Sequence, residues 1–175
     1  MGGLFGRRFA ARIFGVAVAA IALGLIVAPG APAADTQAIL KGARAVPPQS
    51  APAEVKAMIH AANDIRHKPY RWGGGHRDWN SHGYDCSGSV SYVLHAAGLL
   101  DYPLVAEDFT HWGKPRHNKW VTIFASEDHV YMIIAGLRWD TSYITDGDRT
   151  GPGWSEVMRS SKGFHSRHPA GAHQW

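Results

Sequence analysis

Apolar residues at helical spacing predict two helices in the first half of the sequence. One is expected over residues 53–67, where the pattern stops before Pro69. The other is expected from Cys86 to Gly98, because a glycine just past the last apolar position is a common helix C-cap. The apolar positions that mark the two buried faces are Val55, Met58, Ile59, Ala62 and Ile65, and then Val90, Val93, Leu94 and Ala97.

The second half of the sequence changes to short runs rich in β-branched and aromatic residues. Residues 120–124, 129–135 and 137–144 are expected to be strands, with Gly136 in a tight turn between the last two. The segment 163–169 is predicted to add a final edge strand. Helices followed by strands indicate the α+β class, with an antiparallel sheet covered by helices.

The first 34 residues are typical of a signal peptide. Arginines including Arg7 and Arg8 precede an apolar run over residues 13–28, and small residues follow at 31–34, as a cleavage site requires. Because the apolar run is shorter than the roughly 18 residues of a membrane span, cleavage is favoured over a retained anchor. Export by either the general secretory or the twin-arginine route remains open.

Composition and charge limit the classes of partner. The formal charge is +4, but three arginines lie in residues 1–34, and the remaining chain holds 15 basic and 14 acidic side chains. This balance gives no reason to expect nucleic acid as a partner. Residues 35–52, rich in Ala, Pro and Gln, are predicted to be a linker, and residues 53–175 a monomeric domain without cofactor or lasting membrane association.

The chain has one cysteine, Cys86, at the predicted start of the second helix. An exported protein with a single thiol forms no internal disulfide, so this residue is either a small buried apolar group or a reactive one. A helix N-terminus stabilises a thiolate and offers free N–H groups to an oxyanion. Asp85 is expected to be the N-cap in either case.

A catalytic thiol needs a base that is held in place by a third polar group. His129 opens the most apolar predicted strand, and the next strand returns Asp140 and Thr141 toward it. An antiparallel pairing could bring either residue beside the imidazole. Asp140 is the better partner on charge grounds, because a carboxylate stabilises an imidazolium.

Three segments of the sequence resemble the NlpC/P60 family. They are Tyr70-Arg71-Trp72-Gly73-Gly74, Tyr84-Asp85-Cys86-Ser87-Gly88-Ser89-Val90 and His129-Val130-Tyr131-Met132-Ile133-Ile134-Ala135-Gly136. This resemblance covers about residues 55–145 and implies a papain-like core that cuts the peptide stems of peptidoglycan. It also implies Cys86 as nucleophile, His129 as base and Tyr70 close to the thiol. Trp72, Asp85, Ser87 and Thr141 are the other residues expected to bind substrate or to support the site.

The sequence departs from the family pattern in three places. Asp140 or Thr141 stands where the family often has a third catalytic histidine, residues 119–123 replace the usual Pro-Gly-Asp-Leu run, and the loop 75–83 is longer than usual. These departures leave three functions open. They are an exported cysteine peptidase or amidase acting on peptidoglycan stems, a catalytically silent module that binds the wall or a partner, and a related amidase or acyltransferase with another substrate.

Two further groups of residues are weighed against structural roles. Trp72 and Trp79 fall in loops and are candidates for the cleft, although loop aromatics could equally cap the core, whereas Trp120 and Trp139 fall in strands and are expected in the core. The spacing of the eleven histidines matches no common zinc pattern, so no metal site is expected. The protein is expected in the periplasm, in the cell wall or outside the cell.

Overall fold

The computed structural model describes residues 1–2, 36–142 and 151–172. The chain divides into two units, residues 1–31 and 32–175, and the description below concerns the second unit. The predicted signal peptide lies outside the described residues except for its first two positions. In the part of the chain that is described, no helix is both long and apolar enough to cross a membrane.

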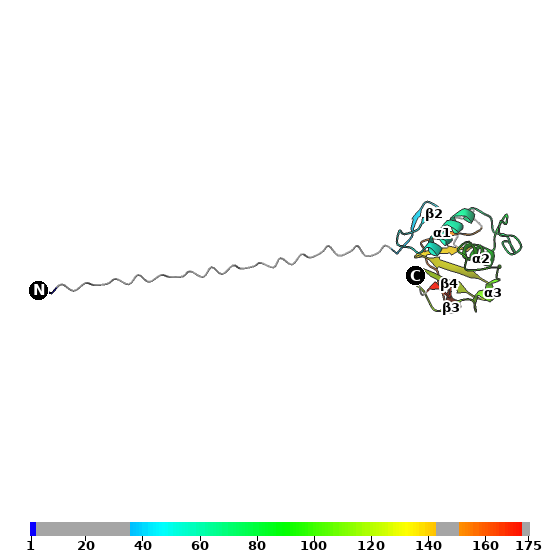
Figure 1. Ribbon diagram of the computed structural model, residues 1–175. Coiled ribbons are helices and arrows are strands. Elements are labelled where there is room, and N and C mark those ends of the chain that lie inside the picture. The colour runs from blue at the N-terminus through cyan, green and yellow to red at the C-terminus, as the bar shows by residue number, and fades with distance from the viewer. Residues whose placement is uncertain (3–35, 143–150, 173–175) are drawn as a thin grey trace. The chain divides into compact units, whose positions relative to one another are not determined.

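The centre of the fold is an antiparallel six-stranded sheet (Figure 1). Its strand order is β3-β8-β4-β5-β6-β7, and every neighbouring pair is antiparallel. The strands span β3 Lys114–Pro115, β4 Val121–Ala125, β5 Val130–Ile134, β6 Leu137–Asp140, β7 Gly153–Ser155 and β8 His165–His168.

Three of these strands follow the sequence prediction, and β8 corrects it. The apolar runs before and after Gly136 form β4, β5 and β6, so β5 is central as its apolar character indicated. The predicted edge strand forms as β8, but it lies inside the sheet between β3 and β4. The outer neighbour is the two-residue strand β3, which is too short to produce a recognisable alternation of apolar and polar residues.

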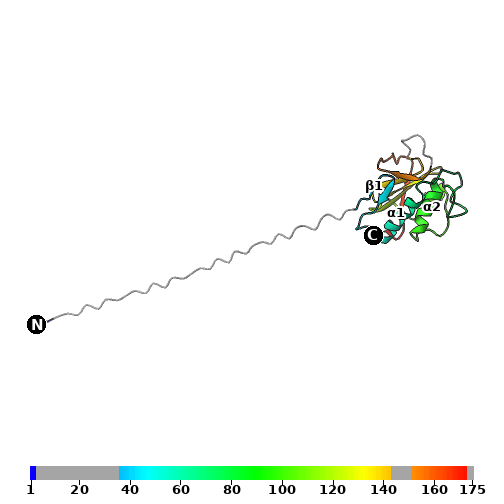
Figure 2. The same cartoon turned by 90° about the horizontal axis from the view of Figure 1, so that it is seen from above.

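Two helices cover one face of the sheet (Figures 1 and 2). Helix α1, Ala53–Ile65, packs against α2, Cys86–Ala96, and both contact β5. A short third helix, α3, covers Ala106–Phe109 and packs on β4. The contact between α1, α2 and β5 is made by fully buried apolar side chains, namely Val55, Met58, Ile59, Ala62, Val90, Val93, Leu94, Val130, Met132 and Ile134.

The end of α2 is fixed by the glycine that the sequence singled out. Gly98 has φ +71°, a left-handed conformation that costs glycine little. Its N–H donates to the carbonyl of His95 (2.9 Å), and the N–H of Leu99 donates to that of Leu94 (3.0 Å). This pair of hydrogen bonds is a Schellman motif, which satisfies carbonyls left free at the helix end.

The segment predicted as a linker, residues 35–52, contains a hairpin of β1, Ile39–Lys41, and β2, Arg44–Val46 (Figure 2). Asn63 of α1 anchors it, since its side chain accepts from the N–H of Ala45 (3.0 Å) and donates to the same residue's carbonyl (2.8 Å). The linker prediction is therefore wrong for this part of the chain. Its Ala- and Pro-rich composition gave no sign of the buried amide, 18 residues away, that holds the hairpin.

The tryptophans predicted for the core are buried there. Trp120 and Trp139 are both enclosed, and Trp139 packs against Trp154 with ring centroids 5.0 Å apart. Trp154 lies in β7, which the sequence pattern did not predict, and its indole N–H donates to Asn63 (3.1 Å). A strand of three residues is too short to show a period of its own.

A tight turn sets the register that brings distant polar residues together. Ala135 and Gly136 both have positive φ, +46° and +82°, as a two-residue type I′ hairpin requires. The register then pairs Met132 with Trp139. As a result, Asp140 at the end of β6 comes opposite the start of β5, where His129 stands.

Candidate active site

The first turn of α2 is built around the carboxylate of Asp85. Its Oδ1 accepts from the N–H of Gly88 (2.7 Å), as an N-cap residue does, and its Oδ2 accepts from the N–H of Gly73 (2.9 Å). The carboxylate therefore joins the helix start to the glycine-rich segment 73–75. Cys86, directly after the cap, is the first residue of the helix.

The glycine-rich segment lies directly on this first turn. A Cβ at Gly88 would collide with the carbonyl oxygen of Gly74, and a Cβ at Gly75 would lie 2.9 Å from the Cα of Gly88. The N–H of Asp85 also donates to the carbonyl of Gly74 (3.2 Å). Glycine is required here because two backbones pack in contact, and this contact forms one wall beside Cys86.

Cys86 borders an open cleft of about 550 Å³. The residue is only 8% exposed and belongs to the buried apolar cluster, and it also lines the cleft wall. The residues that line the cleft are Tyr70, Trp72, Gly73, His76, Asp85, Cys86 and Ser87 on the side of α2, and Val105, Ala106, Glu127 and Asp128 from the segments around α3 and before β5.

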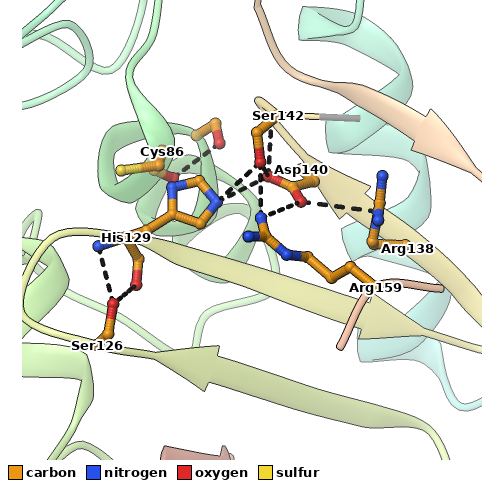
Figure 3. A network of polar contacts seen from close by, with 8 residues as sticks. Cys86, Ser126, His129, Arg138, Asp140, Ser142 and Arg159 are labelled. Atoms are coloured by element: carbon orange, nitrogen blue, oxygen red, sulfur yellow. Dashed lines mark hydrogen bonds and ion pairs between the residues drawn. The ribbon is translucent and has the colours of Figure 1, made fainter. Parts of the chain in front are cut away.

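The ring of His129 lies between Cys86 and Asp140 (Figure 3). Nε2 is 2.9 Å from Oδ1 of Asp140, and the other ring nitrogen, Nδ1, is on the side of Cys86. The backbone of His129 is held by Ser126, whose N–H donates to its carbonyl (2.8 Å) and whose hydroxyl accepts from its N–H (3.2 Å). The imidazole therefore occupies a fixed position at the end of the turn between β4 and β5.

The surroundings of His129 favour its charged form. Burial is the largest single influence and opposes the charge, but hydrogen bonds and charge interactions with Asp140 and Cys86 outweigh it and raise the pKa of His129 to about 9. The pKa of Asp140 is lowered: burial acts to raise it, but His129 and the N–H and hydroxyl of Ser142 stabilise the carboxylate more strongly. At neutral pH the pair is an imidazolium beside a carboxylate.

Of the two residues predicted to orient the imidazole, Asp140 makes the contact. Thr141 is buried, and in the described structure no hydrogen bond joins it to His129. Asp140 is the last residue of β6, which pairs with β5, whereas Thr141 lies beyond the end of that strand.

A second histidine–carboxylate pair lies on the cleft wall, and the sequence prediction missed its histidine. Nε2 of His76 is 3.0 Å from Oδ1 of Asp85 and 3.2 Å from the hydroxyl of Ser87. The hydrogen bond to Asp85 raises the pKa of His76 against an opposing effect of burial. His76 lies in a polar loop without periodicity, so only its place ten residues before Cys86 could have drawn attention to it.

Three other residues around Asp140 were also not predicted from sequence. Ser142 donates its hydroxyl to Asp140 (3.0 Å), and the side chains of Arg138 and Arg159 form ion pairs with it (3.6 and 3.3 Å). Arg138 lies two residues before Asp140 in β6, a spacing that places both on the same face of the strand, whereas Ser142 lies two residues after Asp140, beyond the end of β6. Arg159 is brought in from 19 residues away, a distance that no local pattern encodes.

The aromatic residues predicted at the cleft divide between two positions. Trp72 lines the cleft and is 89% exposed, and Tyr70 lines it close enough to Cys86 and Asp85 for their charges, after burial, to raise its pKa. Trp79 is not a cleft residue, because its ring stacks on that of His95 at 4.0 Å. In the described residues, no group of His, Cys, Asp and Glu side chains could hold a metal ion.

Comparison with known proteins identifies the fold. No family model and no curated protein sequence matches the chain. Among solved structures, the peptidoglycan hydrolase RipB from Mycobacterium tuberculosis is 23% identical, with 66% of this chain and 64% of RipB covered at a TM-score of 0.51. An NlpC/P60 family protein from Bacillus cereus is 19% identical, with 70% and 42% covered at a TM-score of 0.50.

This chain thus spans less than two thirds of the length of those two proteins. RipD from Mycobacterium tuberculosis, described as a non-catalytic NlpC/P60 domain protein, is 19% identical, with 67% of this chain and 98% of RipD covered at a TM-score of 0.48. The resemblance drawn from three sequence segments is confirmed at the level of architecture: the chain has the α+β fold of NlpC/P60 domains.

Proposed function

We propose that this protein is an exported cysteine hydrolase that cleaves amide bonds in the peptide stems of peptidoglycan. The observation that carries the proposal is the position of the His129 ring between Cys86 and the buried carboxylate of Asp140. A nucleophile, a base and a group that orients the base are the parts that acyl transfer requires. The shared fold with the peptidoglycan hydrolase RipB supports the choice of substrate.

In the proposed reaction, the thiolate of Cys86 attacks the carbonyl carbon of the amide, and the electron pair of the C=O bond moves to oxygen. The N–H groups at the start of α2, with Tyr70 nearby as the family resemblance implies, stabilise that oxyanion. When the intermediate collapses, the C–N bond breaks and protonated His129 gives its proton to the leaving amine. An acyl thioester on Cys86 remains.

The second half of the reaction returns the enzyme to its first state. His129, now neutral, takes a proton from water while the water oxygen attacks the thioester carbonyl. The C–S bond then breaks, the acid product leaves, and the thiolate and imidazolium are restored. The pKa of His129 near 9 suits this cycle, because the imidazolium is ready as acid whenever the thiolate is the attacking group.

Export and domain organisation belong to the same proposal. Peptidoglycan lies outside the cytoplasmic membrane, so an enzyme acting on it needs a signal such as the one expected in residues 1–34. The cleavage product, including the hairpin of β1 and β2, is then the functional monomer in the periplasm or cell wall.

The test is digestion of purified sacculi, followed by mass spectrometry of released muropeptides. The unaltered mature protein releases new muropeptides, and Cys86→Ala releases none while keeping the wild-type circular dichroism and thermal midpoint. His82→Gln, a change at an exposed histidine outside the site, serves as the control and releases wild-type amounts. Release by Cys86→Ala at the wild-type rate would end the proposal.

The low exposure of Cys86, 8%, favours one alternative, a silent module that binds wall material through the same cleft. Iodoacetamide distinguishes the two. At pH 6 a thiolate paired with the His129 imidazolium reacts much faster than free cysteine, whereas a silent buried thiol reacts more slowly. Fast alkylation without muropeptide release would instead favour an amidase or acyltransferase with a different substrate.

A further inference from the structure

The side chains of His129, Arg138 and Arg159 surround Asp140, so its single negative charge faces more than one positive charge. Its Oδ1 faces His129 and Ser142, whereas its Oδ2 faces the two guanidinium groups of Arg138 and Arg159 at 3.6 and 3.3 Å. Arg138 is nearly buried beside it. The two oxygens are thus divided, one toward the imidazole and the other toward the arginines (Figure 3).

Arg159 is fixed in this position by contacts beyond the ion pair. Its guanidinium donates to the hydroxyl of Ser142 (2.7 Å) and lies over the rings of Tyr131 and Phe164, 5.3 Å from each centroid. A guanidinium that lies over aromatic rings is held both by dispersion and by attraction to the ring electrons. Arg159 itself lies in the segment between β7 and β8, outside any helix or strand.

The same two rings also contact His129. Its imidazole lies 6.4 Å from the centroid of Tyr131 and 6.3 Å from that of Phe164. The imidazole and the guanidinium of Arg159 therefore share a carboxylate, a serine hydroxyl and an aromatic wall. A change in the charge or position of Arg159 therefore affects the imidazole of His129.

We propose that Arg159 is a positioning residue that acts on the catalytic pair through Asp140: paired with Oδ2, it offsets the carboxylate's charge so that the imidazolium of His129 can release its proton. The inference rests on the proposed role of His129 as acid and base. Nothing in the resemblance to NlpC/P60 domains assigns this residue.

The electrostatic consequence has a definite sign. The titratable and charged groups near His129 are Cys86 from α2, Asp140 from β6, Arg159 and, behind Asp140, Arg138, and the side chains of Tyr131, Phe164 and Ser142 lie beside them. Removing the positive charge of Arg159 leaves Asp140 less compensated and stabilises the imidazolium. If Arg159 only braced the loop, its loss would let Asp140 move away and would destabilise the imidazolium instead.

The first experiment is an NMR titration of the His129 imidazole in a Cys86→Ala background, which needs no enzymatic activity. With Arg159→Gln the titration midpoint rises by about 0.5–1 pH unit, the order expected for one charge at this range in a partly buried site. Arg159→Lys keeps the charge and stays near the parent value. Arg44→Gln, at an exposed arginine on β2, leaves the midpoint unchanged.

The second experiment uses the protein with its cysteine and follows kcat/KM against pH. Arg159→Gln moves the alkaline limb to higher pH and lowers kcat, and Arg159→Lys recovers most of the loss. A midpoint for His129 that is unchanged or lower in folded Arg159→Gln would overturn the inference. Because the titration is made without the nucleophile, it decides about Arg159 even if sacculus digestion were to fail.

Discussion

Two histidine–aspartate pairs lie close to Cys86 and have nearly the same local geometry. In each, Nε2 of the histidine lies within hydrogen-bond distance of a carboxylate oxygen, at 2.9 Å for His129 and Asp140 and at 3.0 Å for His76 and Asp85. A serine hydroxyl completes each group, at 3.3 and 3.2 Å from the same nitrogen. Local geometry alone would not tell which pair does chemistry.

The surroundings of the two carboxylates make the difference. Asp85 accepts N–H groups from Gly73 and Gly88, so it ties a loop to a helix start and needs its charge for that purpose. Asp140 accepts from Ser142 and is held by arginines, on a strand whose register aims it at His129. The capping pair and the pair proposed for catalysis thus differ in the groups that hold each carboxylate.

The largest expected difference between the two pairs is in kcat/KM when each histidine is replaced in turn. His129→Gln lowers kcat/KM by about 10²–10⁴-fold, because no other described side chain replaces it as acid and base. His76→Gln lowers it less than about tenfold, since its amide can still donate to Asp85. Muropeptide release measured for both variants decides the assignment, and equal losses would mean that His76 also takes part in the chemistry.

A smaller effect, on stability, is expected at the capping carboxylate. Asp85→Ala removes the N-cap of α2 and lowers the free energy of unfolding by about 1–2 kcal/mol. Asp85→Asn keeps a capping oxygen and loses less than half of that. Urea unfolding of both variants measures the difference, and an Ala variant as stable as the wild type would contradict the capping role.

The remaining effect is the pH dependence of stability that His129 contributes. Its pKa, about 9 in the folded chain against 6.5 for the free side chain, means that folding favours the protonated form. The stability that follows is fully present below about pH 6.5 and is lost as pH rises through about 9. The gap in unfolding free energy between wild type and His129→Gln should therefore narrow over this interval.

Unfolding free energy measured against pH for a His76 variant gives a second test. Its pKa is also raised by Asp85, so its contribution has the same sign and is likewise lost as pH rises through the raised pKa. The gap between wild type and His76→Gln should begin to narrow near pH 6.5. A gap that widens with pH for either histidine would show that its partner does not hold the charged form.

The sequence predicts correctly those elements whose pattern lies in neighbouring residues. The helical spacing of Val55, Met58 and Ile59 predicts α1, and the apolar run before Gly136 predicts β5. Both patterns are local, because the residues that are buried together lie a few positions apart in the sequence. Cys86 at a helix start and His129 at a strand start follow from the same local reasoning. The hairpin in residues 39–46 and the short strands β3 and β7 escaped it, because long-range partners create them.

By itself, the sequence determined the class of fold and the position of the thiol at a helix start, and it pointed to His129 and to two residues that could contact its imidazole. Only the tertiary structure decided between Asp140 and Thr141, paired His76 with Asp85, and brought Arg159 to the carboxylate. The physical reason is one of distance along the chain. Periodicity and capping act between residues a few positions apart, whereas the charge that His129 feels is set by groups from α2, β6 and the segment after β7, which only folding brings together.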